Sequence, residues 1–125
     1  MITAKYFKES EFDACTPSCS LQEMEQHTMD KLDAARSLAG IPFVLNSAYR
    51  SRAWETSHGH TGTGAHTHGC AVDIRCNTSA NRMKIISACL AVGFRRIGIG
   101  KTYIHVDDDE TQTQNVIWHY YNGTV

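Results

Sequence analysis

The sequence predicts a single α+β domain in which a mostly antiparallel sheet carries helices on one side. The chain has 125 residues, the length of one ordinary domain, so residues 1–125 are expected to share one core. Its 42% hydrophobic and 20% charged residues are typical of a globular protein. A helical pattern comes first, and the strand patterns that follow are interrupted by one further helix and end in short, hairpin-like connections. This order of elements favours an α+β domain.

The first helix is predicted to begin at Ser20. Ser20 and Glu23 have the spacing of a capping box, in which each side chain satisfies a backbone N–H at the start of a helix. Residues at helical spacing follow, namely Leu21, Met24, Thr28, Leu32, Ala35 and Ala39. Gly40, before Ile41 and Pro42, is a typical helix end, so we expect a helix of about five turns.

A short strand over Phe43–Ser47 and a long polar loop from Arg50 to Thr67 are predicted next. Long loops in small domains are often ligand-binding or active-site loops, and this one carries several histidines. We interpret His58 and His60 as solvent-exposed loop residues.

The rest of the chain is predicted to form a strand, a helix and three more strands. In the strand Cys70–Arg75, alternation places Ala71, Asp73 and Arg75 on one face and two apolar residues on the other. Thr78 or Ser79 can cap the helix, which Gly93 ends. The last three strands are expected over residues 94–99, 103–107 and 116–121.

Charge and hydropathy argue against two classes of partner. The formal net charge is -1, so the chain lacks the positive field that binds nucleic acid. No run approaches the roughly 18 apolar residues of a membrane-spanning helix, so no membrane partner is expected. The segment Met1–Phe7 is too polar for a signal-peptide core, so any export is expected to use another route, such as host lysis or a separate pore. Where the chain acts is left open.

The five cysteines are Cys15, Cys19, Cys70, Cys76 and Cys89. They contain no CxxC pair, so neither a zinc ribbon nor a fully paired secreted framework is indicated. Buried free thiols are the first interpretation. One or two disulfides that involve Cys15 or Cys19 are the alternative.

Three residues have the chemistry of a mononuclear zinc site. His66 ends the predicted loop, Asp73 follows seven residues later in a strand, and His105 lies in a later strand. A catalytic zinc takes three protein ligands of this kind and keeps one position open. An aspartate in an apolar strand is costly to bury unless it is paired or binds a cation, which supports a ligand role for Asp73.

Four segments together resemble one family of metallopeptidases. They are Ser47-Ala48-Tyr49-Arg50-Ser51, the pattern HxxGxAxDI over residues 66–74, Gly98-Ile99-Gly100, and Ile104-His105-Val106-Asp107. In this order they resemble the zinc D-Ala-D-Ala carboxypeptidase family, which acts on peptidoglycan, and in particular its small single-domain bacterial and phage branch. The resemblance covers residues 7–118.

The resemblance implies a Hedgehog/DD-peptidase-like fold and a monomer that hydrolyses peptide bonds of peptidoglycan stem peptides or cross-links. It implies one Zn²⁺ held by His66, Asp73 and His105. It also places Arg50 near the substrate, where an always-charged planar donor suits a carboxylate or an oxyanion. Further substrate-binding candidates are Ser47, Tyr49 and His68.

The general base is the point where the chain departs from the family. Many members carry an acidic residue three positions before the last histidine ligand, but here that residue is Thr102. Asp107 shares a strand face with His105, so it is a candidate base and equally a candidate partner that orients His105. The acidic residues that follow Asp107, up to Glu110, are interpreted as a solvated turn.

Three functions stay open at this stage. The first is a zinc carboxypeptidase or endopeptidase, and the second is a non-catalytic, zinc-stabilised domain that binds the cell wall. Thr102, which stands where many family members have an acidic residue, is the feature that supports the second function. A hydrolase of another amide is the third, because fold and ligands do not set the substrate.

Overall fold

Five strands form one sheet in the order β1-β2-β4-β3-β5, in a computed structural model that describes residues 1–121. The strands are β1 (Leu45–Ser47), β2 (Ala71–Arg75), β3 (Arg96–Ile99), β4 (Tyr103–Asp107) and β5 (Val116–His119). All neighbours are antiparallel except β3 and β5. The helices are α1 (Glu9–Asp13), α2 (Gln26–Ala39), α3 (Arg52–Ser57) and α4 (Ser79–Ala91), with 3-10 turns η1 (Leu21–Glu23) and η2 (Ala65–His68). The predicted α+β fold class is therefore confirmed. Residues 122–125 of the predicted domain lie outside the described part.

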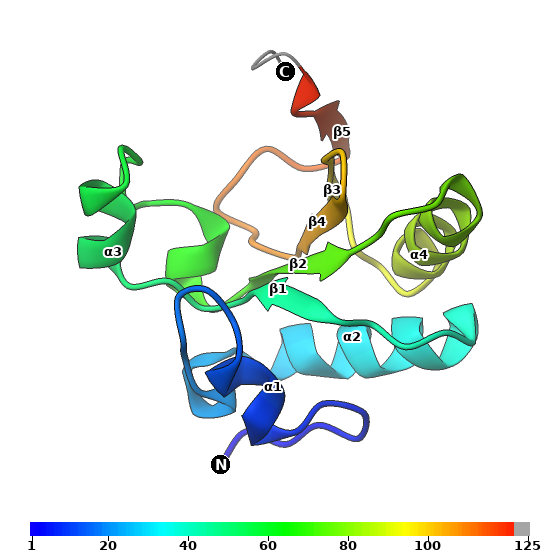
Figure 1. Ribbon diagram of the computed structural model, residues 1–125, viewed down its shortest axis with the longest axis horizontal. Coiled ribbons are helices and arrows are strands. Elements are labelled where there is room, and N and C mark those ends of the chain that lie inside the picture. Colours follow the sequence, from blue (N-terminus) through cyan, green and yellow to red (C-terminus); the bar gives the residue numbers. More distant parts are fainter. Residues whose placement is uncertain (122–125) are drawn as a thin grey trace.

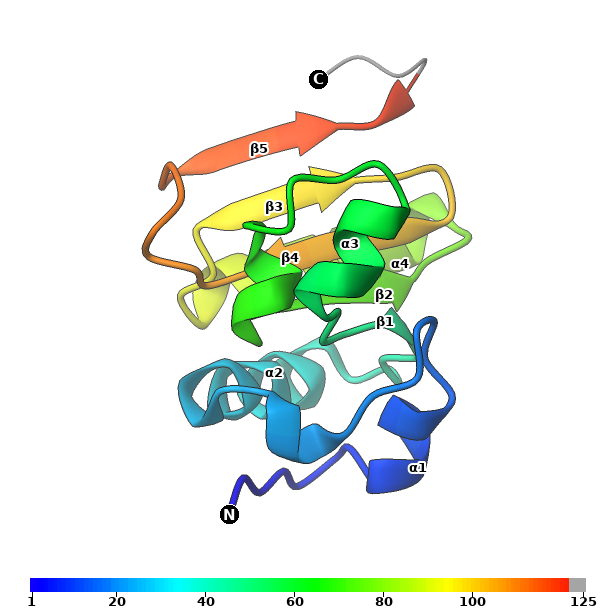
Figure 2. The same cartoon turned by 90° about the vertical axis from the view of Figure 1, so that its left-hand side faces the viewer.

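The two faces of the sheet differ in character. Val72 and Ile74 of β2 join Ile104 and Val106 of β4 in the hydrophobic core, and we call this side the core face. The long helices α2 and α4 pack against each other, and α4 packs on β4. In Figures 1 and 2 the short helix α3 lies on the opposite side of the sheet from α4. That opposite side, which carries Asp73, is called the site face.

The first long helix starts later than the capping box predicts. Ser20 and Glu23 do form the box, but it closes only the 3-10 turn η1. Met24 is extended, and the backbone N–H of Glu25 donates to the Gly69 carbonyl 3.0 Å away. This tertiary bond interrupts the helical backbone, so α2 begins at Gln26. It ends at Gly40, as predicted.

Two other predictions are corrected. The stretch from Arg50 to Thr67 contains α3 and most of η2, so it is not a structureless loop. Ser51 caps α3 by accepting from the backbone N–H of Trp54. The turn after Asp107 is not solvated, because Asp108 and Asp109 are both buried. Within the described residues, no helix is long and apolar enough to cross a membrane.

Gly69 ends η2, and its replacement by alanine is expected to destabilise the fold by about 2–4 kcal/mol. Its φ is +71°, and an added Cβ would lie 2.5 Å from the Glu23 carbonyl oxygen. Gly64→Ala is the matched control, because nothing lies within 4 Å of its added Cβ and its φ is −78°. Urea unfolding of both variants checks this. Equal stabilities would contradict the close approach of the two backbones at Gly69.

Candidate metal centre

The three predicted ligands come from three different elements and meet at one point. His66 lies on η2, Asp73 on β2 and His105 on β4, and Asp73 is the direct cross-strand neighbour of His105. One Asp73 oxygen, Oδ1, lies 3.3 Å from His66 Nε2 and 3.1 Å from His105 Nδ1. All three residues are buried. Segments that are separated in sequence thus place three donor atoms within 4.8 Å of one another.

Each imidazole is fixed by a partner on its other nitrogen. His66 Nδ1 lies 2.6 Å from the Ala48 carbonyl oxygen, to which it donates, so Nε2 faces Asp73. His105 Nε2 lies 2.6 Å from Asp107 Oδ2, so Nδ1 faces Asp73. Histidine ligands of metals usually have such a partner, which sets the tautomer and the ring orientation. The arrangement leaves one nitrogen of each ring available to a metal.

The protonation of the cluster reflects the close contact of its members. Burial raises the pKa of Asp73, but the charges and hydrogen bonds of His66 and His105 outweigh this and hold the pKa well below its usual range. Burial lowers the pKa of His105, but hydrogen bonds with Asp107 and Asp73 outweigh this and raise it to about 9. In the metal-free protein, the protonated His105 imidazole therefore supplies positive charge beside the Asp73 carboxylate.

A carboxylate and two imidazoles within one ion's reach fit zinc, whose protein ligands are nitrogen, carboxylate oxygen and thiolate. The buried Asp73 carboxylate is also the kind of group that a cation compensates. The described residues thus provide three candidate ligands for one metal ion, and a cavity lies in front of them.

That cavity has a volume of about 460 Å³ and is lined by all three donors. Arg50 forms part of its wall, with Nη2 donating to Asp73 Oδ2 at 3.1 Å and Nε donating to Ser47 Oγ at 2.8 Å. The other lining residues are His60, Gly64, Ala65, Arg96, Tyr103, Asp107, Gln112, Trp118 and Tyr120. A guanidinium thus lies beside the three candidate metal ligands.

The sequence profile of the Peptidase M15 family matches residues 5–107 of the chain. The chain belongs to this family. M15 members are zinc peptidases similar to the D-Ala-D-Ala carboxypeptidases, so the predicted family is confirmed. A search of curated proteins finds no match to this M15 chain.

Not every predicted substrate-binding residue of the M15 chain reaches the cavity. Tyr49 packs against the hydrophobic core. His68 points to a second cavity, where its Nδ1 lies 2.7 Å from Asp109 Oδ2. Ser47 is buried and contacts Arg50, so its contribution passes through the guanidinium.

Asp107 contacts the side of the His105 ring that faces away from Asp73 and His66. Its carboxylate is fully buried, contacts the ring nitrogen opposite to the one that faces Asp73, and accepts from Arg96 Nε at 2.8 Å. Of the two predicted roles, this geometry favours the orienting one. Thr102 is exposed and does not line the cavity.

Sequence reasoning missed Arg96 and the aromatic side of the cavity. The Arg96 guanidinium lies 4.9 Å from the Trp118 ring centroid, and the His105 ring lies 5.5 Å from the same ring. Strand pairing brings the rings of His105 and Trp118 together, because Gly98 of β3 lies between these two residues in the sheet. Alternation along the last strand could have placed Trp118 on the site face, but nothing in the sequence indicates that β5 pairs with β3.

The metal-free M15 chain is expected to lose up to about 3 kcal/mol of stability as the pH rises from 6.5 to 9. Folding raises the pKa of His105 from 6.5 to about 9, so its stabilising effect is complete below the lower value and is lost as the pH passes the upper one. Urea unfolding of the metal-free wild type and of His105→Gln, at about pH 6 and pH 9, checks this. The difference between the two proteins should change with pH, and parallel curves would contradict the assignment.

Proposed function

We propose that this M15 chain is a peptidase with one catalytic Zn²⁺, bound at His66, Asp73 and His105, that hydrolyses peptide bonds of peptidoglycan stem peptides or cross-links next to D-Ala. The observation that carries the proposal is the meeting of His66, Asp73 and His105 at a cavity that also contains Arg50. Membership of a zinc peptidase family supports the reaction type. The peptidoglycan substrate, the single zinc ion of this centre and the monomeric state are inferences from the family resemblance.

The M15 chain's own residues would bind and orient the substrate. When bound, zinc acidifies water and polarises a peptide carbonyl. Arg50 is always charged and is held by Ser47 and Asp73, so it can receive a substrate carboxylate or a developing oxyanion without reorganising. Tyr103 and Tyr120, whose ring centroids are 5.6 Å apart, give the cavity an apolar wall for the peptide.

Proton transfer needs another residue, and we infer that His60 supplies it. His60 lines the cavity, and its Nε2 lies 3.8 Å from Glu55 Oε2. That Glu55 oxygen is buried and has no hydrogen-bond partner among residues 1–121, and it also lies 3.9 Å from Arg50 Nη1. A carboxylate behind an imidazole is a common arrangement for a group that accepts a proton and returns it. The pair can thus take the role that Thr102 cannot.

His60→Ala is expected to lower kcat about 10²-fold or more while zinc content stays unchanged, because general acid–base groups contribute that much and His60 is not a ligand. His58→Ala is the matched control, since His58 is an exposed neighbour that stacks on Trp54 and does not line the cavity. Initial rates on a fluorogenic or chromatographically resolved stem peptide measure both. A normal rate for His60→Ala would remove His60 from the mechanism.

The bond that is cut can be read from products. The zinc-loaded protein is incubated with purified linear and cross-linked stem peptides, and the products are identified by mass spectrometry. Loss of a single alanine from linear peptides indicates a carboxypeptidase, and conversion of dimers to monomers indicates an endopeptidase. Intact peptides with stoichiometric zinc would contradict both.

A non-catalytic cell-wall-binding domain is the second candidate. One observation favours it: among the described lining residues, the only carboxylates are Asp73, a ligand candidate, and Asp107, which is engaged by His105 and Arg96. This function predicts that the protein sediments with purified peptidoglycan and releases no peptide.

A further inference from the structure

A second group of metal-ligating side chains lies on the core face of the sheet, outside the cavity described above. Cys70 directly precedes β2 and Asp108 directly follows β4, and the Asp108 backbone N–H donates to the Cys70 carbonyl oxygen at 3.2 Å. Asp73 and His105 belong to the same two strands. Because side chains alternate along a strand, Cys70 and Asp108 point to the side opposite to those two residues.

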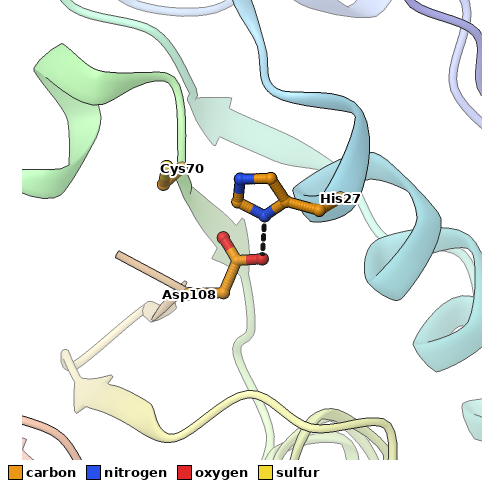
Figure 3. A group of neighbouring side chains, drawn as sticks. All are labelled: His27, Cys70 and Asp108. Carbon is orange, nitrogen blue, oxygen red and sulfur yellow. Dashed lines mark hydrogen bonds and ion pairs between the residues drawn. The ribbon is translucent and has the colours of Figure 1, made fainter. Parts of the chain in front are cut away.

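His27, from the first turn of α2, completes the group. Its Nδ1 lies 2.6 Å from Asp108 Oδ2, and Figure 3 shows its ring facing Cys70 as well as the carboxylate. One donor atom each from His27, Cys70 and Asp108 lies within 4.8 Å of the others. Cys70 and Asp108 are buried, whereas His27 is exposed, so the group opens to solvent on the side of His27.

We propose that His27, Cys70 and Asp108 form a second metal site that takes Zn²⁺ or another thiophilic divalent cation. Nitrogen, sulfur and carboxylate oxygen are the three donor types that zinc accepts in proteins. The group lies in a cavity of about 520 Å³, and Glu25 and Glu110 also line this cavity. A carboxylate or water can therefore fill a remaining position.

In the absence of metal, a lysine supplies the positive charge at this place. Lys31 Nζ donates to Asp108 Oδ2 at 2.9 Å, while Thr28 Oγ1 donates to the other oxygen, Oδ1. The Lys31 side chain is 33% exposed, so its ammonium can move into water. An ion pair of a partly exposed lysine contributes little compared with three metal–ligand bonds. Thr28 can keep its hydrogen bond and hold the carboxylate in place.

Metal uptake also requires the Cys70 thiol to lose its proton. Burial, together with the nearby charges of Asp108 and Asp109, raises the pKa of Cys70 to about 12, so the free thiol is neutral. The anionic surroundings that oppose a lone thiolate favour a divalent cation. When one metal ion binds, Cys70 therefore releases its thiol proton to solvent. The Lys31 ammonium also leaves the Asp108 carboxylate, which becomes a ligand of the metal.

Such a site would join α2 to the start of β2 and the end of β4, the strands that carry Asp73 and His105. Because it links these elements, its role would be structural, and metal binding there would not depend on peptidase activity. The metal content of variants can therefore separate the two sites.

The test is metal stoichiometry of the whole chain after dialysis against Zn²⁺ and, separately, Co²⁺. We expect two equivalents in the wild type and one each in His27→Ala and His66→Ala. His27 is exposed, so its variant should fold, and His58→Ala is a control that should keep two. The Co²⁺ protein should show a thiolate charge-transfer band that survives His66→Ala and Cys89→Ala but is lost in Cys70→Ala.

The outcomes distinguish this site from the candidate centre. One equivalent in the wild type and none in His66→Ala overturns the second site. Two equivalents in His27→Ala, or a thiolate band in Cys70→Ala, also overturns it. If His66→Ala keeps all the metal of the wild type and His27→Ala has none, the second site stands and the centre under the proposed function fails.

Discussion

Replacing His66 by alanine is expected to empty the candidate metal centre and to lower the rate of peptide hydrolysis at least about 10³-fold. A metal ion contributes several kcal/mol to the stability of the transition state, and losing about 4 kcal/mol corresponds to this factor. Of the three candidate ligands, His66 lies outside the sheet, on η2, so the strand pairing between Asp73 and His105 should survive the change. Metal analysis and initial rates measure the two effects.

His68→Ala is the matched control for His66→Ala. It lies two residues later on the same 3-10 turn, but its imidazole contacts Asp109 outside the cavity. Its rate and zinc content at the centre should stay within about twofold of the wild type. If His66→Ala retained the wild-type rate, or His68→Ala lost it, the ligand assignment would be wrong.

Asp107→Ala is expected to weaken zinc binding about 10- to 100-fold and to destabilise the fold by about 3–5 kcal/mol. Asp107 holds His105 by a 2.6 Å hydrogen bond, and it is the partner of Arg96, whose side chain is only 15% exposed. Truncation leaves the guanidinium without its carboxylate and frees the imidazole to turn. Zinc titration and urea unfolding measure the two losses.

Asp107→Asn separates the orienting role from a role as general base. Asparagine keeps the volume and an oxygen that accepts from His105 Nε2, so it should recover much of the zinc affinity and of the rate. Asparagine cannot accept a proton, so a base would be lost in both variants alike. Full zinc occupancy with an Ala-like rate in Asp107→Asn would therefore return Asp107 to the role of base.

The sequence was sufficient for elements whose signals are local. Gly40 ends α2 and Thr78 caps α4 as predicted, because these positions depend on backbone conformation within one turn. The start of α2 could not be predicted, since it depends on a hydrogen bond from Glu25 to Gly69, far along the chain. Helix α3 was missed because six residues are too few to show helical periodicity.

The candidate site divides in a similar way. Motif spacing predicted His66, Asp73 and His105, which the structure brings together. The neighbours of these residues depend on tertiary contacts that no local pattern encodes. Arg96 reaches Asp107, the partner of His105, through the pairing of β3 with β4. Burial of Asp108 follows from the approach of Thr28 and Lys31 on α2. A run of acidic residues therefore looked like a solvated turn although two of its members are buried.

The most direct test of the central claim is to titrate zinc into chelator-stripped His27→Ala protein and to measure hydrolysis of a peptidoglycan stem peptide at each step. This variant leaves the candidate centre intact and removes the second proposed site from the stoichiometry. We predict no hydrolysis without zinc, a linear rise up to one equivalent and a plateau beyond it. Hydrolysis that does not depend on zinc, or one equivalent of bound zinc with an uncut peptide, would contradict the account.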